Sequence, residues 1–129
     1  GRIGDLPSLT DLITLCRNIK ETLHLKSVRM IGSPHLQVNR VAVCSGSGSG
    51  LLDRFFASGA QVFITGDVRY HDARNAEEKQ LGLIDIGHFN SEHLVAKAIS
   101  DRLTTLLKTV DPNISVRACE VEKDPFFII

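Results

Sequence analysis

The spacing of hydrophobic and polar positions along this chain predicts an alternation of helices and strands. Apolar residues at helical spacing indicate amphipathic helices, and one polar segment also has helical character. The predicted helices cover residues 9–24, 51–56, 71–80 and 91–110. Short apolar segments bounded by turn residues indicate strands instead. The predicted strands cover residues 27–31, 40–44, 62–65, 83–86 and 114–118.

Local signals predict where the helices begin and end. Ser8, with Asp11 three positions later, resembles a capping box, so we expect the first helix to begin directly after Ser8. Gly59 and Gly82 are expected to stop the second and third helices. The longest helix carries one apolar face. That face consists of Leu94, Val95, Ala98, Ile99, Leu103, Leu106 and Leu107.

The order of these elements indicates an α/β fold. From residue 40 onward, strands and helices alternate, which is typical of a mixed, mostly parallel central sheet with helices on both faces. No repeat or linker divides the chain, so we expect residues 1–129 to form a single α/β domain. The apolar end at residues 126–129 is expected to pack on this domain or on a partner.

Composition excludes several classes of partner. Fifteen basic residues balance fifteen acidic ones, so the chain shows no basic face for nucleic acid and no polybasic membrane anchor. No apolar run approaches the ~20 residues that span a bilayer. The cysteines Cys16, Cys44 and Cys119 each lie in or beside an apolar stretch, which favours buried thiols over disulfides. We therefore expect a cytoplasmic protein.

Three predicted loops follow the carboxyl ends of strands, at residues 45–50, 66–72 and 87–92. Ligands of open α/β sheets bind at this edge, so these loops are expected to form the functional site. They contain most of the chemically reactive side chains of the sequence. Those side chains are Asp67, Tyr70, His71, Asp72, His88, Asn90 and Glu92.

His88 and Glu92 are candidate metal ligands. An imidazole and a carboxylate four residues apart lie on one side of a helix and can reach a common ion. Together they suit Zn, Mn, Fe, Co or Ni. Two ligands are too few for a tight site, because a catalytic zinc usually has three from the protein. The alternative is a surface histidine near a helix start with an exposed glutamate.

The segment from Gly66 to Asp72 offers acid–base chemistry. Asp67 and Asp72 could orient His71, or His71 could itself act as an acid or base near neutral pH. The alternative is structural, with Gly66 and Asp67 forming a tight turn and Asp72 capping the next helix.

The alternating serines and glycines at residues 45–50 lie between a strand and a helix, where backbone N–H groups can cradle a phosphate. The segment lacks the Gly-Lys-Ser/Thr of a Walker loop and the spacing of G-x-G-x-x-G. A loop that leaves room for an anionic ligand or for a neighbouring subunit fits better than a dinucleotide site.

Four ordered blocks of this chain resemble the C-terminal half of the Nif-three-like family, whose members are often labelled GTP cyclohydrolase 1 type 2 homologue. The closing Asp124-Pro125-Phe126 is also similar to the usual end of these proteins. The four blocks cover residues 1–6, 41–48, 62–73 and 86–92.

The resemblance implies a two-lobed protein with two divalent metal ions (Zn, Fe, Mn, Co or Ni) per full-length chain, assembled as a homo-oligomer, a ring-shaped hexamer. It implies that His88 and Glu92, in a Gly-His-x-x-x-Glu arrangement, are the ligands of the second lobe. His71 would lie near the metals without binding them. The remaining ligands would come from the missing first lobe of the same protein, which is therefore a partner that this chain requires. We also expect Gly1 to be a cut point in a longer protein.

Three functional hypotheses follow. The first is a metal-dependent hydrolase for a nucleotide-like or phosphate-bearing substrate, in which a metal activates water and His71 or Asp67 assists as acid, base or orienting group. The second is a metal-binding regulatory or protein-interaction module without catalysis. The third is a nucleotide-binding domain that uses the serine–glycine loop alone.

Overall fold

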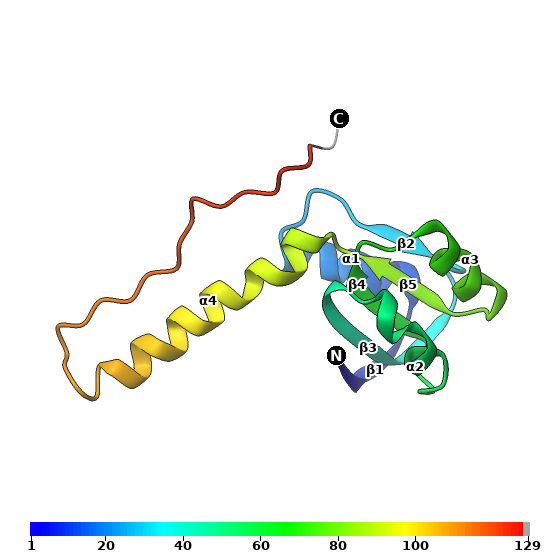
Figure 1. The fold of residues 1–129 in the computed structure, drawn as a ribbon. Helices are drawn as coiled ribbons and strands as arrows, with labels where there is room; N and C mark the ends of the chain where they lie inside the picture. Colours follow the sequence, from blue (N-terminus) through cyan, green and yellow to red (C-terminus); the bar gives the residue numbers. More distant parts are fainter. Residues whose placement is uncertain (128–129) are drawn as a thin grey trace. The chain divides into compact units, whose positions relative to one another are not determined.

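A computed structural model describes residues 1–127, and its chain divides into two compact units, Gly1–Ser91 and Glu92 onward. The two units are described separately. The elements are shown in Figure 1. They are β1 (Arg2–Asp11), α1 (Leu12–Thr22), β2 (Arg29–Ile31), β3 (Gln37–Ser47), the 3-10 turn η1 (Ser49–Leu51), α2 (Leu52–Phe56), β4 (Val62–Gly66), α3 (Tyr70–Glu78), β5 (Gly82–Asp85) and α4 (His88–Leu107).

The first unit is built around one five-stranded sheet with the strand order β1-β3-β4-β5-β2. The three central strands are parallel, with Ile64 of β4 between Val43 of β3 and Ile84 of β5. The edge strands β1 and β2 run antiparallel to their neighbours. The predicted mixed α/β class is confirmed, with the parallel pairing confined to the centre of the sheet.

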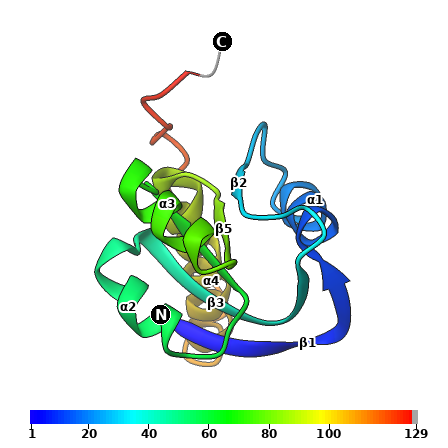
Figure 2. The same cartoon turned by 90° about the vertical axis from the view of Figure 1, so that its right-hand side faces the viewer.

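Helices cover both faces of this sheet, as the alternation of elements predicts. Successive side chains of a strand point to opposite faces. Val62 and Ile84 therefore pack with α1 on one face, while Phe63 and Leu83 pack with α2 and α3 on the other. Figure 2 shows α1 on one side of the strands and α2 and α3 on the other. The ring of Phe63 stacks on that of Phe55, with centroids 5.3 Å apart.

The predicted start of the first helix is wrong. Residues 2–11 form strand β1, whose ends pair with β3, and a register shift between Asp5 and Thr10 accommodates the irregular middle. The helix begins at Leu12, because Asp11 is its N-cap and accepts a hydrogen bond from Thr14 N at 2.8 Å. Pairing with β3 thus outweighs the local capping signal at Ser8.

Two further boundaries differ from the prediction. Strand β3 continues through Ser45 to Ser47, so half of the serine–glycine segment belongs to this strand. Gln80, with φ of +57°, makes the left-handed turn after α3, and Gly82 opens β5 instead of stopping the helix. A Cβ at Gly82 would lie 3.1 Å from side-chain atoms of Leu12 and Val62, so a larger residue here would require these side chains to shift.

The second unit consists of the helix α4 from Glu92 onward and an extended segment. No residue of α4 is buried, and the predicted apolar face is exposed at Leu94, Val95, Ile99, Leu103 and Leu106. The predicted strand at residues 114–118 is absent, because among the described residues no strand pairs with it. At the apolar end, Phe126 and Phe127 are exposed. Ile128 and Ile129 lie outside the described residues.

The three cysteines differ in exposure. Cys16 is buried in the core, Cys44 is half-buried and Cys119 is exposed, so the expectation of buried thiols is confirmed for Cys16 and wrong for Cys119. Burial raises the pKa of the Cys16 thiol, which keeps this group protonated and unreactive. Within residues 1–127, no helix is both long enough and apolar enough to cross a bilayer.

Candidate metal centre

The loops after β4 and β5 lie next to each other at one edge of the sheet. The two strands are parallel neighbours, with Thr65 opposite Asp85, so the loops that follow them leave the sheet at the same edge. Gly66 permits their close approach. A Cβ at Gly66 would lie 2.8 Å from the backbone C of Gly87 and from the backbone N of His88. The His88 backbone can therefore occupy this position only because residue 66 is a glycine and has no side chain.

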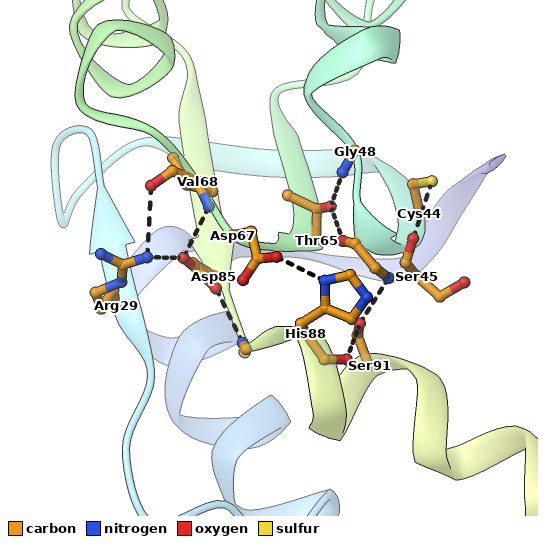
Figure 3. A network of polar contacts seen from close by, with 12 residues as sticks. Arg29, Cys44, Ser45, Gly48, Thr65, Asp67, Val68, Asp85, His88 and Ser91 are labelled. Carbon is orange, nitrogen blue, oxygen red and sulfur yellow. Dashed lines mark hydrogen bonds and ion pairs between the residues drawn. The ribbon is translucent and has the colours of Figure 1, made fainter. Parts of the chain in front are cut away.

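Asp67 and His88 are joined by a hydrogen bond across these loops. The Asp67 Oδ2 atom lies 2.6 Å from His88 Nδ1, and the two side chains point toward each other in Figure 3. Both side chains are about half exposed. An ionised carboxylate can only accept a hydrogen bond, so Nδ1 must carry the proton. In the neutral ring the lone pair then lies on Nε2, the nitrogen through which such a histidine binds a metal.

A second, buried carboxylate lies between the same two loops. Asp85, at the end of β5, accepts hydrogen bonds from Val68 N at 3.0 Å and from Gly87 N at 2.9 Å. It also forms an ion pair with Arg29 of β2. Asp85 was not among the site residues predicted from the sequence. An acidic residue inside a buried apolar strand was the available signal, because a buried charge requires partners.

Side chains of Thr65 and Ser91 form hydrogen bonds with the backbone of the serine–glycine segment. Thr65 Oγ1 accepts from Gly48 N at 2.9 Å and donates to the Gly46 carbonyl at 3.0 Å. The Gly46 N–H donates to Ser91 Oγ at 2.7 Å. Two of the N–H groups of this segment are thus engaged within the protein and are not available to a phosphate. The hypothesis of a nucleotide site built on this segment alone stays a prediction that would have to use its other N–H groups.

The structure does not bring Asp67 and Asp72 to His71. Asp67 contacts His88, while the buried Asp72 accepts hydrogen bonds from Arg69 Nε at 2.9 Å and Ser49 Oγ at 2.7 Å. The Arg69 guanidinium lowers the pKa of Asp72, burial opposes this effect, and the Ser49 hydroxyl adds to it. His71 is exposed in the first turn of α3, where its ring meets Tyr70 edge-on at 5.6 Å.

Asp72 is also not the N-cap of α3. Arg69 occupies the N-cap position without a side-chain capping bond, and Asp72 lies in the first turn. There its negative charge interacts favourably with the N-terminal end of the helix. Asp72 therefore has a structural role at the start of α3, as the alternative interpretation proposed, but it acts from the first turn and not as the N-cap.

Helix α4 begins at His88, three residues before the predicted start, and contains both candidate metal ligands. Glu92 lies four positions after His88 in this helix, so the two residues lie on the same side of it. Both are exposed. Among residues 1–127, no three His, Cys, Asp or Glu side chains come together in a group that could hold a metal ion. A complete centre would need ligands from elsewhere.

Comparison with known proteins places this chain in a family. Residues 1–125 match the family described as Duf34/NIF3 (NGG1p interacting factor 3). The chain therefore belongs to the DUF34/NIF3 family, as the four sequence blocks predicted. The family assignment is independent of the geometry of the site.

Individual relatives agree with this assignment. The "GTP cyclohydrolase 1 type 2 homolog" of Staphylococcus aureus is 34% identical over 98% of this chain, which spans 34% of that protein. The crystal structure of a hypothetical protein of S. aureus superposes with a TM-score of 0.89 at 31% identity, covering 98% of this chain and 42% of that one. A Bacillus cereus protein related to NIF3 gives the same TM-score at 28% identity, covering 98% of this chain and 35% of that one.

Proposed function

We propose that this chain is one lobe of a metal-dependent hydrolase and that His88 and Glu92 supply part of a dinuclear metal site. The remaining ligands would come from a part of the protein outside this chain. The observation that carries the proposal is the 2.6 Å contact between Asp67 Oδ2 and His88 Nδ1. Metal-binding histidines commonly donate their second ring N–H to a carboxylate, which fixes the tautomer and the orientation of the ring.

The donor set fits a borderline divalent ion such as Zn, Fe, Mn, Co or Ni, because it combines an imidazole with a carboxylate. When bound, such an ion lowers the pKa of a coordinated water and provides a hydroxide nucleophile. The residues of this chain would perform the remaining tasks. Asp67 holds the His88 ring in place, and the exposed His71 is proposed as the group that takes up or releases a proton.

The proposed substrate is nucleotide-like or phosphate-bearing, and the proposed assembly is a homo-oligomer, a hexamer. Support for the substrate class comes from the name of the S. aureus relative, "GTP cyclohydrolase 1 type 2 homolog". A reaction of that class would require a metal-activated water to attack a purine ring carbon.

The metal ligands can be tested by elemental analysis of the intact protein that contains this chain. We expect about two metal ions per chain, as in two-metal hydrolytic sites. His88→Ala and Glu92→Ala should each reduce this content strongly, because each removes a ligand from a site that has few. His35→Ala, at an exposed histidine in the loop between β2 and β3, serves as the control and should leave it unchanged. Full metal retention in both ligand variants would contradict the proposal.

A second candidate is a metal-binding regulatory or interaction module without catalysis. The exposed apolar side chains of α4, among them Val95 and Leu106, favour it, because such a surface is typical of a protein interface. Assays on the same intact, metal-loaded protein distinguish the hydrolase from the module. Turnover of a nucleotide or phosphate ester supports the hydrolase. A stable protein complex without any turnover supports the module.

A further inference from the structure

Asp85 is a buried carboxylate between the two loops that carry Asp67 and His88. Its side chain is only 2% exposed. The Oδ1 atom accepts from the Gly87 N–H, whereas Oδ2 accepts from the Val68 N–H and from the Arg29 guanidinium. Figure 3 shows these contacts converging on Asp85. Three donors from three separate segments thus compensate the cost of removing this charge from water.

These contacts act directly beside the Asp67–His88 pair. Val68 follows Asp67 in the chain, and Gly87 precedes His88. Asp67 has φ of +55° and Gly87 has φ of +82°, so both loops pass through left-handed backbone. Aspartate tolerates this conformation better than most residues, but it still costs free energy that surrounding contacts can offset. The hydrogen bonds from Val68 and Gly87 to one carboxylate provide those contacts on both sides.

Arg29 extends this arrangement to the edge of the sheet. It pairs with Asp85 and also donates to the Val68 carbonyl at 3.4 Å. The loop after β4 is therefore held through Val68 at both its N–H and its carbonyl. Arg29 belongs to β2, which is the strand next to β5.

We infer that Asp85 is a positioning residue that sets the geometry in which Asp67 orients His88 for metal binding; this inference rests on the proposed function. The site requires a group that accepts on both oxygens, because all its neighbours donate. Asparagine has the same shape but presents an NH₂ group to one of these donors. Asp85→Asn therefore releases one of the two loops without opening a cavity.

The test uses the intact protein that contains this chain, compared as wild type, Asp85→Asn and Ile84→Val. Ile84 is fully buried on the same strand and packs in the α1 layer, so its variant controls for a general loss of stability. Two properties are measured: the ¹H–¹⁵N NMR signal of the His88 ring in the chelator-treated protein, and zinc affinity by calorimetry. Asp85→Asn should alter the ring signal and weaken zinc binding by about 10-fold or more, as loss of a group supporting a metal ligand does. Ile84→Val should change neither.

An unchanged His88 ring signal in Asp85→Asn would overturn the inference. An altered ring signal with unchanged zinc affinity would also overturn it. So would changes of the same size in the ring signal and zinc affinity of Ile84→Val. A wild-type protein that binds no zinc would contradict the proposed function, while the ring signal would still decide the role of Asp85. If Asp85→Asn does not fold, Arg29→Gln decides, because its guanidinium is largely exposed. That variant should shift the ring signal in the same direction by less, and no shift would overturn the inference.

Discussion

Gly48 and Gly50 lie two residues apart in the serine–glycine segment, but their surroundings differ. A Cβ at Gly48 would lie 2.5 Å from Thr65 Oγ1 and 2.7 Å from Cζ of Phe63, whereas a Cβ at Gly50 would meet no atom within 4 Å. The Phe63 ring cannot move aside, because it is buried and stacked on Phe55. Gly48 is therefore required by the packing around the segment, and Gly50 is not.

We expect Gly48→Ala to lower the free energy of unfolding by about 1–3 kcal/mol, the usual cost of overpacking a close-packed site. Gly50→Ala, the matched control, should be neutral or stabilise by about 0.4–1 kcal/mol, because alanine restricts the unfolded chain. Urea unfolding of both variants measures the difference. Equal destabilisation by the two substitutions would show that the close contacts at Gly48 relax without cost.

At the level of single residues, sequence predicts which side chains approach the site but not which of them pair. Asp67 and His88 follow strands, so their presence at one edge follows from the parallel sheet. Their pairing depends on the left-handed backbone of Asp67 and on the contact between Gly66 and the backbone of Gly87 and His88. Local spacing contains neither feature, and it suggested His71 as one possible partner of Asp67.

At the level of elements, Asp11 fixes the junction between β1 and α1. Its carboxylate accepts the Thr14 N–H hydrogen bond. The side chain of Thr14 and, to a smaller extent, this backbone bond lower the pKa of Asp11. We expect Asp11→Ala to lower the urea midpoint, because the first turn of α1 loses its capping acceptor. Asp11→Asn should retain most of the stability, because asparagine caps helices about as well as aspartate. Equal loss in both variants would contradict a capping role.

The same cap predicts a pH dependence. The pKa of Asp11 is lower in the folded protein than its usual 3.8, so folding favours the ionised form. The contribution of the charge is complete above the unfolded pKa and is lost as the pH falls through the lower folded value. Below about pH 4, wild type should lose this part of its stability, and Asp11→Asn should not. Urea midpoints of both proteins measured across this range test the sign.

Sequence predicts the central elements better than the outer ones. Continuous apolar runs define β4 and β5 within a residue, because a strand buried on both faces needs such a run. Strand β1 was missed because its partners in β3 lie far away in the sequence, from Asp11 opposite Gln37 to Arg2 opposite Val43. Its exposed residues also carry no alternating pattern. The strand predicted at residues 114–118 failed for the opposite reason, since β-forming residues there have no described partner strand.

At the level of the whole molecule, buried residues are unevenly distributed. Among residues 1–127, all the buried core residues belong to the first unit, and helix α4 contributes none. Burial of an apolar face supplies most of the stability of protein helices. The apolar periodicity of residues 91–110 correctly predicted a helix, but it contains no information on whether its apolar face is covered.

This distribution predicts large differences in hydrogen exchange along the chain. Amides of β3, β4 and β5 should exchange slowest in the chain of residues 1–129, because they belong to the core that opens only on global unfolding. Amides of α4 beyond Glu92 should exchange faster by at least about tenfold, because none of its residues is buried. Helix α1, anchored by the buried Leu12 and Leu15, is the internal control and should be protected more than α4. Protection of α4 equal to that of α1 would mean that its apolar side chains are covered in solution, and mass spectrometry of peptic fragments measures this directly.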